Sequence, residues 1–89
     1  MAGIVQNVVF NKQIWSVIDS ANYCLNTGYK VKKIDESDDL IYYRQVNPLC
    51  LKKKGYTYYL TKRLNYGIEV VIAYRPIAEG VYALKGYSP

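Results

Sequence analysis

The sequence predicts a small α+β domain in which one helix packs on a mostly antiparallel sheet of four or five strands. Three observations favour this class. One stretch combines apolar residues at helical spacing with capping residues at both ends. Other stretches are rich in Val, Ile, Tyr and Thr, and turn-forming residues separate them. The length of 89 residues suits a single domain with one modest core.

The first two expected elements are a strand and the helix. Residues 4–10 are mostly β-branched or aromatic, which predicts a strand. The helix is expected at residues 17–27. Ser16 and Asp19 resemble a capping box at its start. Gly28 supplies the left-handed residue that commonly ends a helix.

Two apolar stripes of this helix are candidates for the side that faces the core. One consists of Val17, Ala21, Cys24 and Leu25, and the other of Ile18, Ala21 and Leu25. Trp15 stands just before the helix, so we expect its ring to fasten the start of the helix to the core.

Four further strands are expected after the helix. Two extended runs flank the polar segment at residues 35–39, which predicts a hairpin loop, and Pro48 ends the second run. Residues 49–55 (LCLKKKG) are expected to form a basic loop. The runs at residues 56–64 and 67–75 then predict two more strands. The expected order is therefore β-α-β-β-β-β.

The domain is expected to comprise residues 1–76. Residues 77–89 show no clear period but are too apolar for a plain solvated tail, so they are interpreted as a C-terminal arm. This arm would dock on the domain or bind a partner or a second copy. Its candidate contact residues are Ile77, Val81, Tyr82 and Leu84.

Strand alternation sorts the tyrosines of the basic half between two faces, because successive side chains in a strand point to opposite sides. The side chains expected in the core are Tyr43, Tyr56, Tyr58 and Leu60. Those expected on the face away from the helix are Tyr42, Arg44, Tyr59, Arg63 and Arg75. A shift of one residue in the register would exchange the two faces.

The charge of the chain indicates an acidic partner. The net charge is +5, and residues 41–89 carry eight Lys or Arg against two Glu. Aromatic rings that stack on bases, beside cations that neutralise phosphates, are typical of surfaces that bind single-stranded nucleic acid. The residues predicted to bind nucleic acid are Tyr42, Arg44, Lys52, Lys53, Lys54, Tyr59, Lys62, Arg63 and Arg75.

A second hypothesis is a structural or assembly protein, either a minor virion component or a homo-oligomer. Its Tyr-rich face and C-terminal arm would contact protein instead of nucleic acid. Tyr and Arg are also common anchors of protein interfaces, so composition does not separate the two hypotheses.

The chain lacks the residue patterns of an enzyme or a metal protein. It has no His and two Cys, so no acid–base or zinc site is expected. The acidic residues between 35 and 39 do not have the spacing of a calcium loop. We therefore expect no enzymatic activity, cofactor or metal. The sequence has no secretory signal or membrane span, which favours the cytoplasm of a host cell or a virion.

Several short motifs are spread over about residues 8–75: Trp15, Gly28-Tyr29-Lys30, Arg44-Gln45, Pro48, Thr61-Lys62-Arg63 and the run from Gly67 to Ile72. In these motifs the chain resembles small uncharacterised proteins encoded by phages and large DNA viruses. The resemblance implies a viral context and an accessory or virion-associated role, and it implies no particular activity. Where that family has several Arg in the third strand, this chain keeps Arg44 but has Tyr42 and Val46.

Overall fold

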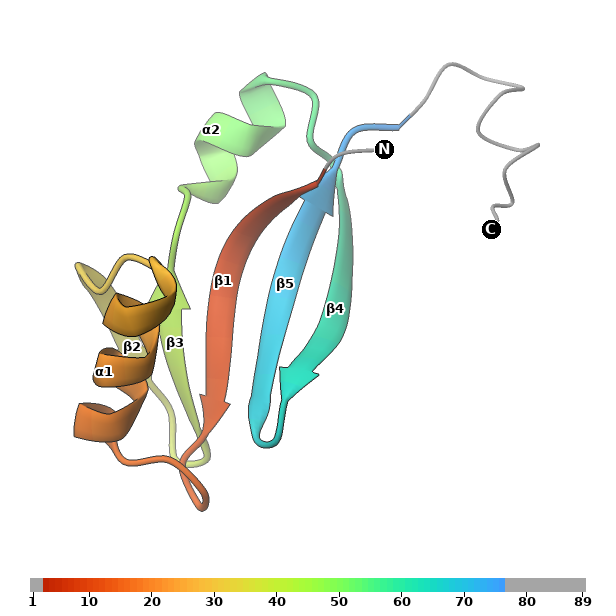
Figure 1. Ribbon diagram of the computed structural model, residues 1–89. Helices are drawn as coiled ribbons and strands as arrows, with labels where there is room; N and C mark the ends of the chain where they lie inside the picture. The colour runs from red at the N-terminus through yellow and green to blue at the C-terminus, as the bar shows by residue number, and fades with distance from the viewer. Residues whose placement is uncertain (1–2, 77–89) are drawn as a thin grey trace.

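The computed structural model describes residues 3–76, which form one antiparallel five-stranded sheet and two helices (Figure 1). The sheet order is β2-β3-β1-β5-β4. The α+β class is confirmed, but the chain order is β-α-β-β-α-β-β because a second helix precedes β4. The elements are β1 (Ile4–Asn11), α1 (Val17–Thr27), β2 (Lys33–Glu36), β3 (Leu40–Arg44), α2 (Pro48–Lys53), β4 (Tyr58–Asn65) and β5 (Ile68–Tyr74).

Helix α1 has the predicted bounds and caps. The Ser16 Oγ accepts a hydrogen bond of 3.0 Å from the backbone N–H of Asp19. Gly28 has a φ of +88°, and its N–H donates to carbonyls of the last turn. A residue with a side chain adopts that backbone conformation only at a cost, so the glycine defines where the helix stops.

The side of α1 that faces the sheet matches the first predicted stripe at Ala21 and Cys24 but not at Val17 or Leu25, and it differs from the second stripe at Ile18 and Leu25. Ser20 and Cys24 are its buried residues, while Ile18 is 73% exposed and Leu25 is 61% exposed. This choice of buried residues is explained by Tyr43 of β3, which is completely buried. A buried phenol needs a hydrogen-bonding partner, so a serine faces the sheet at a position where an aliphatic side chain was expected.

Tyr43 joins the helix to the sheet through its hydroxyl group. The hydroxyl lies 2.6 Å from the Ser20 Oγ and donates to the carbonyl of Val17 at 3.2 Å. Burial raises the pKa of the Tyr43 hydroxyl, and the hydrogen bond with Ser20 offsets part of that effect. The tyrosine therefore holds α1 over β3 in a definite position.

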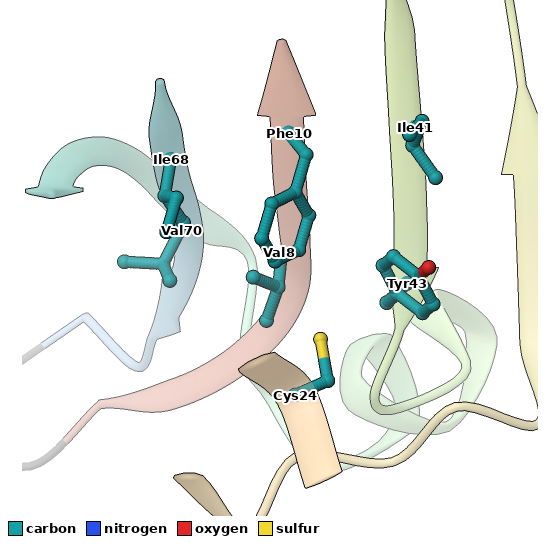
Figure 2. Close-up of a cluster of buried hydrophobic side chains, with 7 residues drawn as sticks. All are labelled: Val8, Phe10, Cys24, Ile41, Tyr43, Ile68 and Val70. Carbon is teal, nitrogen blue, oxygen red and sulfur yellow. The ribbon is translucent and has the colours of Figure 1, made fainter. Parts of the chain in front are cut away.

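The hydrophobic core lies between α1 and the three central strands (Figure 2). Edge-on aromatic contacts extend it toward the start of the helix: the ring of Phe10 lies 5.4 Å from that of Trp15 and 5.9 Å from that of Tyr23. Trp15 packs against the core as predicted. The buried side chains drawn in Figure 2 are Val8, Phe10, Cys24, Ile41, Tyr43, Ile68 and Val70.

The segment predicted to be a basic loop contains helix α2. The Asn47 side chain accepts a hydrogen bond of 2.9 Å from the N–H of Leu49, and Pro48 takes the first helical position. Both residues favour a helix start. Six residues are too few to show a helical apolar period, so the pair Asn47-Pro48 is the only local indication of this helix. Leu51 is the buried residue of α2.

Strand β4 lies outside the area that α1 covers. The prediction that Tyr58 and Leu60 face the core is wrong, because they are 42% and 46% exposed. Their side chains do point to the α1 side of the sheet, since they pair in register with Tyr74 and Ile72. One helix of eleven residues is too narrow to cover five strands.

The thiol of Cys24 makes the stability of the protein sensitive to alkaline pH. Burial raises its pKa from 9.0 to about 11. Above pH 9 the unfolded chain releases this proton while the folded chain keeps it, so stability falls as the pH rises. We expect the thiol to account for a loss of about 2 kcal/mol in the free energy of unfolding between pH 8 and pH 10.5.

Guanidinium unfolding at these two pH values measures the loss, with Cys24→Ala as the control. The variant has a lower stability at both pH values because it leaves a small cavity. However, its stability should fall less between the two pH values than that of the wild type. An equal fall in the two proteins would show that Cys24 does not hold its proton in the folded state.

Candidate nucleic-acid interface

The pairing register places four of the predicted site residues on one face of the sheet. Tyr42 and Arg44 pair with Val9 and Asn7 of β1, which point away from the buried Val8. We call this surface the helix-distal face. It consists of Lys33 and Asp35 (β2), Leu40, Tyr42 and Arg44 (β3), Ile4, Asn7, Val9 and Asn11 (β1), Glu69, Val71 and Ala73 (β5), and Tyr59, Thr61 and Arg63 (β4).

The four residues lie on two separate strands of this face. Tyr42 and Arg44 are half-buried on β3, while Tyr59 and Arg63 are exposed on β4. β1 and β5 lie between these strands, so three strand spacings, roughly 14 Å, separate the two pairs. The alternation correctly predicted which side these residues occupy, but not the distance between them.

Asn7 leaves a polar atom without a partner at the centre of the helix-distal face. Its Oδ1 is buried and accepts no hydrogen bond from any described residue. Such an atom normally has a partner, because leaving it unpaired costs roughly 1–3 kcal/mol. Its neighbours in register are Arg44 and Val71.

Five predicted site residues do not join this face. Lys52, Lys53 and Lys54 belong to α2 and its C-cap. Lys62 pairs in register with the buried Val70, so it points to the α1 side. The Arg75 Nε donates to the carbonyl of Lys54 at 3.0 Å, and its guanidinium lies 5.0 Å from the centre of the Tyr56 ring. Arg75 therefore holds the chain between α2 and β4 against the end of β5.

The antiparallel topology gathers positive charge at one end of the sheet. β1 runs antiparallel to β3 and β5, so β2 and β4 begin where β3 and β5 end. The loop between α1 and β2 and the helix α2 both adjoin this end (Figure 1). We call it the basic end, and its cations are Lys30, Lys32, Lys33, Arg44, Lys52, Lys53, Lys54 and Arg75.

Hydrogen bonds from Gln45 connect the segments of the basic end. The Gln45 side chain accepts from the N–H of Lys30 at 2.7 Å and donates to its carbonyl at 2.9 Å. Its backbone N–H donates to the carbonyl of Gln6 at 2.8 Å. The loop that carries Lys30, Lys32 and Lys33 is thereby fixed beside the end of β3.

The acidic residues lie elsewhere in the described chain. They occur at the start of α1, in the second half of β2, in the turn that follows it and at the start of β5. Within residues 3–76, the single ion pair joins Lys12 to Glu36 at 3.0 Å. No cation of the basic end is thus paired with a described carboxylate, and a concentrated positive potential results.

The other end of the helix-distal face has a mixed character. A hollow of about 360 Å³ lies there, next to the turn between β4 and β5. Its lining includes Val9, Leu40, Tyr66, Arg63 and Glu69. Arg63 and Glu69 are opposite each other in register, so the positive charge of Arg63 is offset locally.

The basic end includes residues that the sequence analysis did not select. Lys30, Lys32 and Lys33 were missed because they lie in the half of the chain whose net charge is negative. A signal was present, since three lysines within four residues follow the helix-ending Gly28. The topology was needed to show that this run lies at the same end as Arg44 and α2.

The side chains gathered at the basic end are cationic, which is the chemistry that an anionic ligand would require. Among residues 3–76, no three His, Cys, Asp or Glu side chains lie together as a metal site requires. In the same range, no helix is long and apolar enough to cross a membrane.

The predicted contact residues of the C-terminal arm, Ile77, Val81, Tyr82 and Leu84, lie outside the described residues.

No protein-family model, curated protein or solved structure matches this chain. The interpretation of the site therefore rests on its own geometry and charge.

Replacing Asn7 by Val should stabilise the isolated protein. The variant removes the unpaired Oδ1 and places a β-branched side chain in a central strand. We expect the free energy of unfolding to rise by about 1 kcal/mol, measured by guanidinium denaturation.

Asn11→Val is the matched control on the same strand and face. The Asn11 Oδ1 accepts a hydrogen bond of 2.9 Å from the N–H of Gln13, so this change should lower stability. A loss of stability in both variants would mean that the Asn7 Oδ1 has a partner in solution.

Proposed function

We propose that this protein binds single-stranded nucleic acid without catalysing a reaction. The backbone phosphates of the ligand contact the basic end, and bases stack on tyrosines of the helix-distal face. The observation that carries this proposal is the separation of charge along the strands. Eight cations gather at one end of the described domain, and its carboxylates lie away from that end.

A polyanion is the partner that such a surface favours. Like charges held close together repel one another and oppose folding, and an anionic ligand relieves that repulsion. Lysines on flexible stems form contacts with phosphates that depend little on sequence. The lysines of α2 and of the loop before β2 flank Arg44 and fit this role.

Tyr59 is the tyrosine best placed for stacking. It lies near the start of β4 on the helix-distal face, next to the basic end, and it is 40% exposed. Tyr42 is half-buried and lies further from that end, in register with Val9. A ring that stacks on a base contributes roughly 1–3 kcal/mol, so a single exposed tyrosine has a measurable effect.

Neutralising a lysine of the basic end should weaken binding and reduce its dependence on salt. We expect Lys30→Gln and Lys53→Gln each to lower the slope of log K against log salt by about 0.7, because each removes one phosphate contact. Fluorescence anisotropy with a labelled oligothymidylate at several salt concentrations measures both quantities.

Lys62→Gln is the control with the same change of charge. Lys62 is exposed but points to the α1 side of β4, so its replacement should leave the slope nearly unchanged. The proposal fails if the wild-type protein does not bind the oligonucleotide at low salt. It also fails if all three variants lower the slope equally, since binding would then reflect net charge alone.

Removing the ring of Tyr59 should lower affinity without changing the salt slope. We expect Tyr59→Leu to cost roughly 1–3 kcal/mol of binding free energy, because stacking is lost while the phosphate contacts remain. Tyr66→Leu provides a matched comparison, since Tyr66 is 73% exposed in the turn at the opposite end of the sheet. Equal losses in the two variants would exclude a specific stacking role for Tyr59.

A further inference from the structure

The two edges of the sheet differ in a way that points to a partner for one of them. The β2 edge is four residues long and carries the charged residues Lys33, Asp35 and Glu36. A short edge with charged side chains discourages pairing with another strand. The β4 edge is eight residues long, is exposed along its whole length and contains no proline; its charges, Lys62 and Arg63, and its register shift lie in its second half. Between Tyr59 and Asn65, an edge of this kind offers backbone donors and acceptors to another strand.

We propose that β4 pairs antiparallel with β4 of a second copy of this chain, around a two-fold axis at Thr61. The two five-stranded sheets would then continue into one. This interface is isologous, because the same strand serves both partners. The inference goes beyond nucleic-acid binding and does not rest on it.

The side chains of β4 complement themselves in this register. Thr61 lies opposite Thr61 of the second copy, and threonine pairs are favourable across strands. Arg63 lies opposite the second copy's Tyr59, where a guanidinium can contact the ring. Lys62 lies opposite the second copy's Leu60, which its aliphatic stem can cover.

Shifting the axis by one residue to Lys62 would place two lysines directly opposite each other, which is destabilising. An axis at Thr61 avoids direct opposition of like charges. It also joins residues that point to the same side in both copies: Thr61 lies on the helix-distal face, while Leu60 and Lys62 lie on the α1 side. Charge therefore disfavours the axis at Lys62, and the threonine pair with the flanking contacts of Arg63 and Lys62 favours the axis at Thr61.

The charge distribution of the whole domain favours the same arrangement. Antiparallel pairing directs the basic ends of the two copies to opposite ends of the joined sheet. Each basic end then lies at the same end of the joined sheet as the acidic residues of the second copy. The electrostatic fields of the two copies therefore oppose each other instead of adding. Parallel association of two copies would place both basic ends together.

The chain's own residues 77–89 are the alternative occupant of this edge. β5 ends at Tyr74, at the end of the sheet where β4 begins. A strand continuing from there to the free edge would have to cross over β4 and then run parallel to it. Parallel pairs are slightly less stable per residue, so a second copy fits the edge better.

Disulfide trapping at the two-fold axis tests the register. Opposite residues of an antiparallel pair have Cα atoms about 4.5–5.5 Å apart, which a disulfide can span. Cys50 is exposed and is first replaced by Ser, whereas Cys24 is buried and stays. Under mild oxidation, Thr61→Cys in this background should form a covalent dimer.

Thr57→Cys in the same background is the control. Residue 57 is also exposed, but this register would place it opposite Asn65 of the second copy, far from its own symmetry mate. The control and the background protein should remain uncrosslinked. Equal crosslinking at positions 57 and 61 would overturn the proposed register.

Sedimentation of the unmodified full-length protein, without nucleic acid, tests the association itself. The expected result is a dimer that Thr61→Arg weakens by about tenfold or more, because two like charges meet at the axis. Thr57→Arg adds the same charge outside the pair and should change the dissociation constant little. A wild-type monomer at all concentrations overturns the proposal, as does a dimer that loses its association only when residues 77–89 are deleted.

Failure of this test leaves the nucleic-acid proposal intact, because no oligonucleotide is present. Conversely, a dimer that binds no oligonucleotide supports the pairing of β4 and excludes the proposed function.

Discussion

The contact between Tyr43 and the first turn of α1 determines which surfaces of this domain are free. The buried phenol bonds to Ser20 and to the carbonyl of Val17, so the helix is held over β3 and the neighbouring β1. With α1 fixed there, the strand beyond β5 has no helix above it. The exposed β4 and the helix-distal face thus follow from one polar contact in the core.

Antiparallel pairing then sets the distribution of charge. Because neighbouring strands reverse direction, segments distant in sequence meet at one end of the sheet. Their cations come together there, while acidic residues follow at the turns of the other end. The net charge of +5 understates this effect, since a domain with separated charges has a strong local field even when its total charge is modest.

Local signals allowed much of the fold to be predicted, and long-range packing accounts for the rest. Ser16 and Gly28 define α1 through backbone bonds within a few residues, so their effect is readable from sequence. Alternation assigned Tyr42 and Tyr59 to the same face because the side-chain period of a strand is fixed at two. The exposure of Leu60 depends on the position of α1. That Lys30 and Arg44 lie at the same end of the sheet depends on the strand order. Neither follows from a local pattern.

Under the proposed function, the basic end would also link binding to stability. Its lysines repel one another, and two side chains oppose that repulsion by bonding to backbone groups: Gln45 bonds to Lys30, and Arg75 bonds to the carbonyl of Lys54. These bonds fix the loops before an anion arrives, so a ligand needs to order little more than the lysine side chains. A polyanion that binds only the folded state adds to stability by mass action. Under the proposed function, the charge that weakens the free protein would be the same charge that makes its bound form more stable.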